Sequence, residues 1–221
     1  MKKFFTTLKN IWSIVELRDK ILITLGFLVI YRLGSFIVLP GIDPDKLVKS
    51  VGGFFGLLDT FLGGAFSKAS IFGLGIMPYI SASIVIQLLT VAMPYFQKMQ
   101  KEGESGRKKI NQITRVLTIF ICLSQSVAYI KGTISSDAII INETIFFFQA
   151  MIILTSGTIF CMWLGEKITD KGIGNGISML IMIGIISRFP AQLIAEAVSK
   201  GLSGALLFLL EIVALFFVIM A

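Results

Sequence analysis

The sequence predicts an all-α integral membrane protein, built as a bundle of helices that span the membrane. Two observations support this fold class. Hydrophobic residues make up 55% of the chain and charged residues only 15%, whereas about a quarter of the residues in an average soluble domain are charged. The apolar residues also fall into long runs, and a run of about 18 or more with few charges is typical of a membrane span.

Six apolar runs are long enough to be considered as spans. The first is interrupted only by Arg32, and the last carries Glu211 near its middle. The second contains Pro78, which we expect to bend the helix because proline removes a backbone hydrogen bond. The last run stops at Ala221 without a polar tail, so we expect the chain to be a fragment of a longer protein. The predicted spans are 21–39, 71–96, 112–130, 144–165, 172–194 and 201–221.

Basic residues are divided unevenly between the two ends of these spans. Thirteen Lys and Arg residues fall on the side of the amino terminus and six on the other side. Because cytoplasmic loops carry an excess of Lys and Arg, the amino terminus is predicted to be cytoplasmic. Most of the net charge of +7 would then face the cytoplasm. There it either fixes the topology and attracts anionic lipid, or binds an acidic or RNA-rich partner.

Residues that commonly carry chemistry are scarce. The sequence contains no histidine, which excludes His-based metal sites and Ser-His-Asp triads. Cys122 and Cys161 lie inside apolar runs, and we interpret them as small hydrophobic residues. The glycines of 172–176 follow no predicted strand, so they do not indicate a nucleotide site. We therefore expect no enzyme activity, no metal and no cofactor.

A short apolar segment, 51–67, precedes the second span and is flanked by glycine pairs. It is too short to cross a membrane. It is either a helix lying in the membrane interface, or a re-entrant helix on flexible glycine joints, able to fill a cavity and swing out.

The second span carries a pair of isoleucines, Ile76 and Ile80, which are four residues apart and therefore share one helix face. Small residues follow them at 81–83 and allow close contacts between helices. Periodicity alone favours ordinary packing of this span.

The connection after the second span is expected to be a loop, because Gly103, Ser105 and Gly106 should break the helix. Three basic residues follow them directly: Arg107, Lys108 and Lys109.

Four long motifs resemble the SecY/Sec61α family of translocation channels, in its bacterial form. They are YRLGSFIVLPGID at 31–43, FLGGAFSKASIFGLGIMPYISASIVIQLLT at 61–90, KEGESGRKKI at 101–110 and MWLGEKITDKGIGNGIS at 162–178. The resemblance implies ten helices in two inverted halves of five, which close like a clamshell around a pore. Residues 1–200 would form the amino-terminal half, and 201–221 would begin the second half.

The resemblance also implies a pore and a plug. Ile76, Ile80 and Ile181 match positions of the family's pore ring. A ring of apolar side chains excludes water and ions from a constriction. The segment of about 52–66 matches the plug that seals the outer funnel. Its candidate residues are Gly53, Phe54, Phe55, Leu58, Asp59, Phe61, Leu62 and Gly64.

Two further sites follow from the same resemblance. Spans two and three match one side of the lateral gate, which is predicted to be lined by Ile84, Val85 and Leu88. The basic loop is predicted to lie near cytoplasmic partners through Arg107, Lys108 and Lys109.

The function implied by the resemblance is that of a central pore-forming subunit. Such a subunit passes unfolded secretory proteins across the bacterial inner membrane and releases membrane segments sideways into lipid. The implied partners are the SecE and SecG subunits, the SecA motor, the ribosome, signal sequences, nascent chains and membrane lipids, without sequence-specific binding of nucleic acid.

The main alternative is a secondary transporter of small solutes, because broken helices and glycine hinges also fit one. A transporter should bring ionisable residues together at mid-membrane depth. Only Glu211 meets this condition in the sequence.

Overall fold

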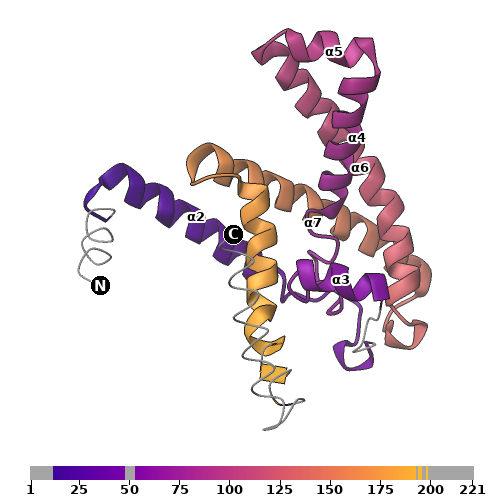
Figure 1. The fold of residues 1–221 in the computed structure, drawn as a ribbon. Helices are drawn as coiled ribbons and strands as arrows, with labels where there is room; N and C mark the ends of the chain where they lie inside the picture. The colour runs from indigo at the N-terminus through magenta and orange to yellow at the C-terminus, as the bar shows by residue number, and fades with distance from the viewer. Residues whose placement is uncertain (1–11, 48–52, 193, 196–197, 199–221) are drawn as a thin grey trace.

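The computed structural model describes residues 12–47, 53–192, 194, 195 and 198. Within these residues the protein is helical, and its strand-like pairing is limited to two isolated bridges, Val38 with Ser70 and Ile42 with Ile139. The prediction of an all-α fold is confirmed. The labelled helices are α2 (Val15–Gly34), α3 (Gly53–Phe61), α4 (Met77–Ala92), α5 (Pro94–Lys101), α6 (Glu104–Thr133) and α7 (Glu143–Lys171) (Figure 1).

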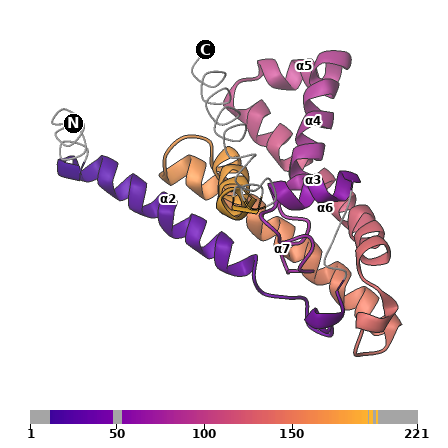
Figure 2. The same cartoon turned by 60° about the horizontal axis from the view of Figure 1, so that its bottom comes forward.

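Helix α7 lies at the centre of the arrangement and packs against α2 on one side and α6 on the other (Figures 1 and 2). Helices α4 and α6 also pack against each other, and α5 caps their far end. An apolar helix, Gly176–Gln192, follows α7. It carries Arg188 near its carboxyl end.

Helices α6 and α7 are long and apolar enough to cross a membrane. They contain the predicted spans 112–130 and 144–165 and extend beyond them at both ends. The helix Gly176–Gln192 lies within the predicted fifth span. The predicted sixth span, 201–221, lies outside the described residues.

The first predicted span is wrong at its carboxyl end, because α2 stops at Gly34 rather than at residue 39. The chain then extends alongside the segment that precedes α4. There the backbone N–H of Leu39 donates to the carbonyl oxygen of Ala69 at 2.8 Å, and the N–H of Ile71 donates to that of Ile37 at 2.9 Å. These long-range bonds replace the hydrogen bonds that another helical turn would make.

The second predicted span is also wrong in two respects. Its helix begins at Met77 instead of residue 71, and Pro78 lies in the first helical turn, where a missing N–H costs nothing. The bend expected at Pro78 occurs instead before Pro94, where α4 and α5 meet at 98°. Met93 is extended, with φ −112° and ψ 125°, because a residue before proline is driven out of the helical region.

The predicted cytoplasmic loop is largely helical. Only Gly103 leaves the helical conformation, with φ +72°, whereas Ser105 and Gly106 belong to α6. A Cβ added at Gly106 would lie 1.7 Å from the carbonyl oxygen of Met99. Gly106 is therefore a contact that lets α5 approach α6, and Lys109 lies on the second turn of α6 rather than in a loop.

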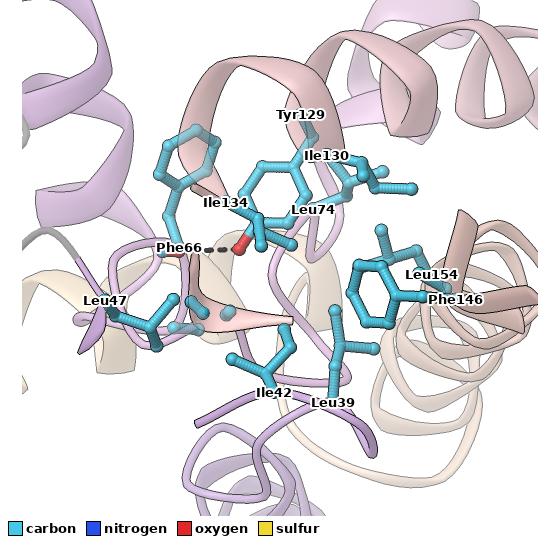
Figure 3. Packing of buried hydrophobic residues seen from close by; sticks show 14 of the residues in the cluster. Leu39, Ile42, Leu47, Phe66, Leu74, Tyr129, Ile130, Ile134, Phe146 and Leu154 are labelled. Atoms are coloured by element: carbon cyan, nitrogen blue, oxygen red, sulfur yellow. Dashed lines mark hydrogen bonds between the residues drawn. The ribbon is translucent and has the colours of Figure 1, made fainter. Parts of the chain in front are cut away.

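Two buried clusters form the core. The larger one joins the segment after α3 to α6 and α7, and Figure 3 shows Phe66 and Leu74 of this segment around Tyr129. The smaller one joins α2, α7 and the helix Gly176–Gln192. Cys122 and Cys161 are buried free thiols, which agrees with their interpretation as small hydrophobic residues.

Candidate pore and plug

Helix α3 and the residues after it pack back into the protein. Leu62 and Phe66 are both buried in the larger core cluster, and the hydroxyl of Tyr129 donates to the carbonyl oxygen of Phe66 at 2.6 Å (Figure 3). This burial of the residues that follow α3 favours the re-entrant interpretation of the segment.

The candidate plug residues occupy different environments. Leu58 is half-buried and lines an apolar cavity of about 270 Å³ between α3, α4 and α6. Phe61 is exposed, whereas Gly64 is buried. The side chains at 53–55, which include Gly53, Phe54 and Phe55, lie outside the described part of the chain, although their backbone belongs to α3.

Asp59 is the charged member of the segment, and it is only 4% exposed. Its carboxylate pairs with the guanidinium of Arg188 at 2.5 Å and accepts the backbone N–H of Ser67 at 2.8 Å. Arg188 also donates to the hydroxyl of Ser67 at 3.3 Å. A buried carboxylate needs such partners because burial without them is costly.

Arg32 of α2 holds the same segment from the other side. Its guanidinium donates to the carbonyl oxygen of Gly63 at 3.0 Å and lies 5.0 Å from the ring centroid of Phe36. The ammonium of Lys68 lies over the same ring at 4.2 Å. Burial, and then the positive charges of Arg32 and Arg188, hold the pKa of Lys68 below its ordinary value.

The backbone turns tightly where these contacts meet. Gly63 and Gly64 have φ of +62° and +90°, values that favour glycine. A Cβ added at Gly63 would lie 2.6 Å from an Arg32 nitrogen, and one at Gly184 would lie 2.1 Å from the carbonyl oxygen of Phe61. The glycine pair therefore allows two arginines and a neighbouring helix to approach the backbone closely.

Sequence reasoning did not connect Asp59 with Arg32 and Arg188. The signal was present, because each arginine interrupts an apolar run, and a charge in such a run requires a partner. The sequence did not indicate which acceptor each arginine would meet.

The three candidate pore residues lie around the smaller core cluster. Ile76 is 2% exposed and precedes the first turn of α4, while Ile80 and Ile181 are half-buried against the same cluster. The N–H of Ile80 donates to the carbonyl oxygen of Ile76 at 3.1 Å. Thus residues from α4 and from the helix Gly176–Gln192 meet in one apolar cluster.

The candidate gate residues Ile84, Val85 and Leu88 are all exposed on α4. The buried residues of α4 are Pro78, Ala82 and Ile86, which recur every four positions and so define one helix face. The gate residues lie outside this buried row.

The basic residues at the start of α6 are exposed. Lys109 pairs with Glu102 at 3.6 Å. Arg107 lines a polar cavity of about 260 Å³ together with Tyr79, Gln87 and Asn111. Lys108 has no ion pair among the described residues.

The described part of the chain holds no group of three or more Cys, Asp or Glu residues that could bind a metal ion. Together, the long apolar helices define a helical, multi-pass membrane protein.

The chain belongs to the SecY family, because the family model described as SecY matches residues 70–221. It is similar to the protein translocase subunit SecY of Escherichia coli (strain K12), with 46% identity over 202 residues, which cover 88% of this chain and 45% of the relative. The chain spans about half the length of the curated relatives it matches.

Solved structures share the fold. One is described as Sec61 in the canine ribosome-channel complex from the endoplasmic reticulum, with a TM-score of 0.64 and 19% identity over 85% of this chain and 42% of that one. Another is described as showing that the plug domain of the SecY protein stabilizes the closed state of the translocation channel. Its TM-score is 0.56, with 20% identity over 85% of this chain and 41% of that one.

Proposed function

We propose that this chain forms the amino-terminal half of the pore-forming subunit of a protein-translocation channel. The observation that carries the proposal is the meeting of Ile76, Ile80 and Ile181 in one apolar cluster, with a re-entrant helix packed in the same protein. Branched apolar side chains can close a constriction to ions and still deform around a passing chain. The relatives, which are translocase subunits, support a channel over the secondary-transporter alternative.

Within this proposal, residues 1–200 supply the first half of the channel and 201–221 begin the second. The segment of about 52–66 is the plug, and Ile84, Val85 and Leu88 line a lateral gate through which apolar segments leave for lipid. Their exposure supports this role, because a gate surface needs apolar side chains that are not already covered. The channel performs no covalent chemistry and needs no cofactor, so a partner supplies the energy.

The proposed partners act at the cytoplasmic end of α6. Arg107, Lys108 and Lys109 are exposed there, so a ribosome or the SecA motor could dock on them through charge. SecE and SecG, membrane lipids, signal sequences and nascent chains complete the proposed set. We also propose that the amino terminus is cytoplasmic and that the protein lies in the bacterial inner membrane. A thiol at position 108 should then be labelled only from the cytoplasmic side.

The proposal is tested by crosslinking in the full-length protein that carries this segment. Single cysteines at 76, 80 and 181 should each crosslink to a secretory protein stalled during translocation. A cysteine at Ile152, which is 66% exposed on α7, serves as the matched control and should not crosslink. Equal crosslinking at the control position, or none at the three isoleucines, would contradict the pore assignment.

A further inference from the structure

The contacts around Asp59 join three separate parts of the chain. Asp59 belongs to α3, Arg32 to α2, and Arg188 to the helix Gly176–Gln192. Arg188 binds the carboxylate of Asp59, and Arg32 binds the carbonyl oxygen of Gly63. Two arginines from different helices therefore converge on the carboxyl end of α3.

We propose that Arg188 and Arg32 are positioning residues that latch the plug in its closed place. This inference rests on the proposed function, because it requires α3 to be the plug. The latch has two parts, an ion pair at Asp59 and a hydrogen bond at Gly63. Opening the channel then requires both to break.

The latch suits a segment that has to be released. Leu57 and Phe61 of α3 remain exposed, so apolar packing covers only part of the helix. Apart from the Arg188 pair, α3 meets the helix Gly176–Gln192 where the backbone of Gly184 lies against the backbone of Phe61 and Gly63. A short polar bond breaks over a small displacement, because its energy depends steeply on distance and angle.

Charge is the property on which the latch depends. Asp59 pairs with Arg188 and also attracts Lys68, whose ammonium is repelled by both Arg32 and Arg188. Removing the carboxylate would take its negative charge away from this group of three cations. Removing Arg188 would leave a buried carboxylate without its partner. Either change disfavours the closed arrangement, for different reasons.

The test measures ion conductance of the idle channel, reconstituted in planar bilayers as the full-length protein with its partner subunits. Asp59→Asn and Arg188→Gln should each raise the conductance at least about tenfold, since loss of one partner of a buried pair shifts an equilibrium by more than a decade. The matched control is Arg115→Gln, which removes an exposed arginine–carboxylate pair with Glu166. It should leave the conductance unchanged.

Exchanging the charges of Asp59 and Arg188 distinguishes leakage caused by loss of this ion pair from leakage caused by a general loss of structure. The double variant Asp59→Arg with Arg188→Asp should leak less than either of its two single variants, because the exchanged pair restores the attraction. Arg188→Lys, which keeps the charge, should lie between wild type and Arg188→Gln. Conductance is expressed per detergent-stable channel, so poorly folded variants do not contribute.

Deleting residues 53–65 distinguishes the two proposals. If the deletion leaks and the Asp59 and Arg188 variants do not, the latch is wrong and the plug assignment stands. If the double variant leaks as much as the single variants Asp59→Arg and Arg188→Asp, the pairing of Asp59 with Arg188 is also contradicted. If even the deletion leaves the conductance unchanged, the plug assignment itself fails.

Discussion

Helices α6 and α7 pack through small and hydroxyl-bearing side chains, whereas α3 is attached to its neighbours through charges and backbone. At the first interface, Cys122 and Leu154 are fully buried, and the thiol donates to the hydroxyl of Thr158 at 3.4 Å. At the second, Asp59 meets Arg188, and glycine backbone meets glycine backbone.

This difference shows how one chain can combine a fixed frame, formed by α6 and α7, with a displaceable segment, formed by α3 and the residues up to Phe66. Close packing of small side chains involves many weak contacts, which are lost only together. A few discrete polar bonds can be exchanged for water when the segment moves. The frame and the segment meet where Leu62 and Phe66 pack into the larger core cluster, and there Tyr129 of α6 donates a hydrogen bond to the carbonyl oxygen of Phe66.

The largest effect is expected inside the frame. Leu154→Ala removes a fully buried side chain from α7 and should destabilise the protein by about 2–5 kcal/mol, because it leaves a cavity. Thermal unfolding in detergent should show a clear drop in Tm. Ile152→Ala is the control on the same helix, since Ile152 is 66% exposed, and an equal drop there would contradict the role of packing.

A smaller effect, of a different kind, is expected at the contact between α3 and its neighbour. Gly184→Ala puts a methyl group against the carbonyl oxygen of Phe61 and should cost about 1–3 kcal/mol as an overpacked contact. Because α3 can move away, the result should be a higher ion conductance, with little loss of folded protein.

Gly26→Ala on α2 is the matched control, because no atom lies within 4 Å of a Cβ added there. It should be neutral or slightly stabilising, since alanine favours a helix interior over glycine. Loss of folded protein in Gly184→Ala without a rise in conductance would show that α3 belongs to the fixed frame.

The smallest effect is expected where the two regions meet. Tyr129→Phe removes the hydroxyl that donates to Phe66 and should cost about 0.5–1.5 kcal/mol, the net contribution of one hydrogen bond, because α3 can loosen and let water reach the carbonyl oxygen. Hydrogen exchange should therefore speed up at 62–66 more than within α7. Equal acceleration in both regions would remove the distinction between frame and segment.

Apolar runs predicted the frame well. The runs at 112–130 and 144–165 lie inside α6 and α7, because an uninterrupted apolar stretch in a membrane can satisfy its backbone only as a helix. The run at 71–96 was less informative. Residues 71–76 are apolar enough for a membrane helix, but they are not helical. Gly75 has φ +52°, and the N–H of Ile71 donates to the carbonyl oxygen of Ile37 instead of to a residue of its own helix.

The site was predicted in part. Resemblance to the family singled out Ile76, Ile80, Ile181 and Asp59, and the structure places the three isoleucines at one cluster. Periodicity could pair only Ile76 with Ile80, because Ile181 comes from a different helix. The roles of these residues in a pore and a plug remain predictions.

The sequence by itself determined the membrane class, the helices α6 and α7, and the family, because these depend on local composition and on long contiguous motifs. Only the tertiary structure decided where α2 ends, where α4 begins, and that Asp59 meets Arg188. Each of these depends on a hydrogen bond or ion pair between residues far apart in the chain. The energy of such a bond depends on distance and angle, which no run of residues specifies before the helices are packed.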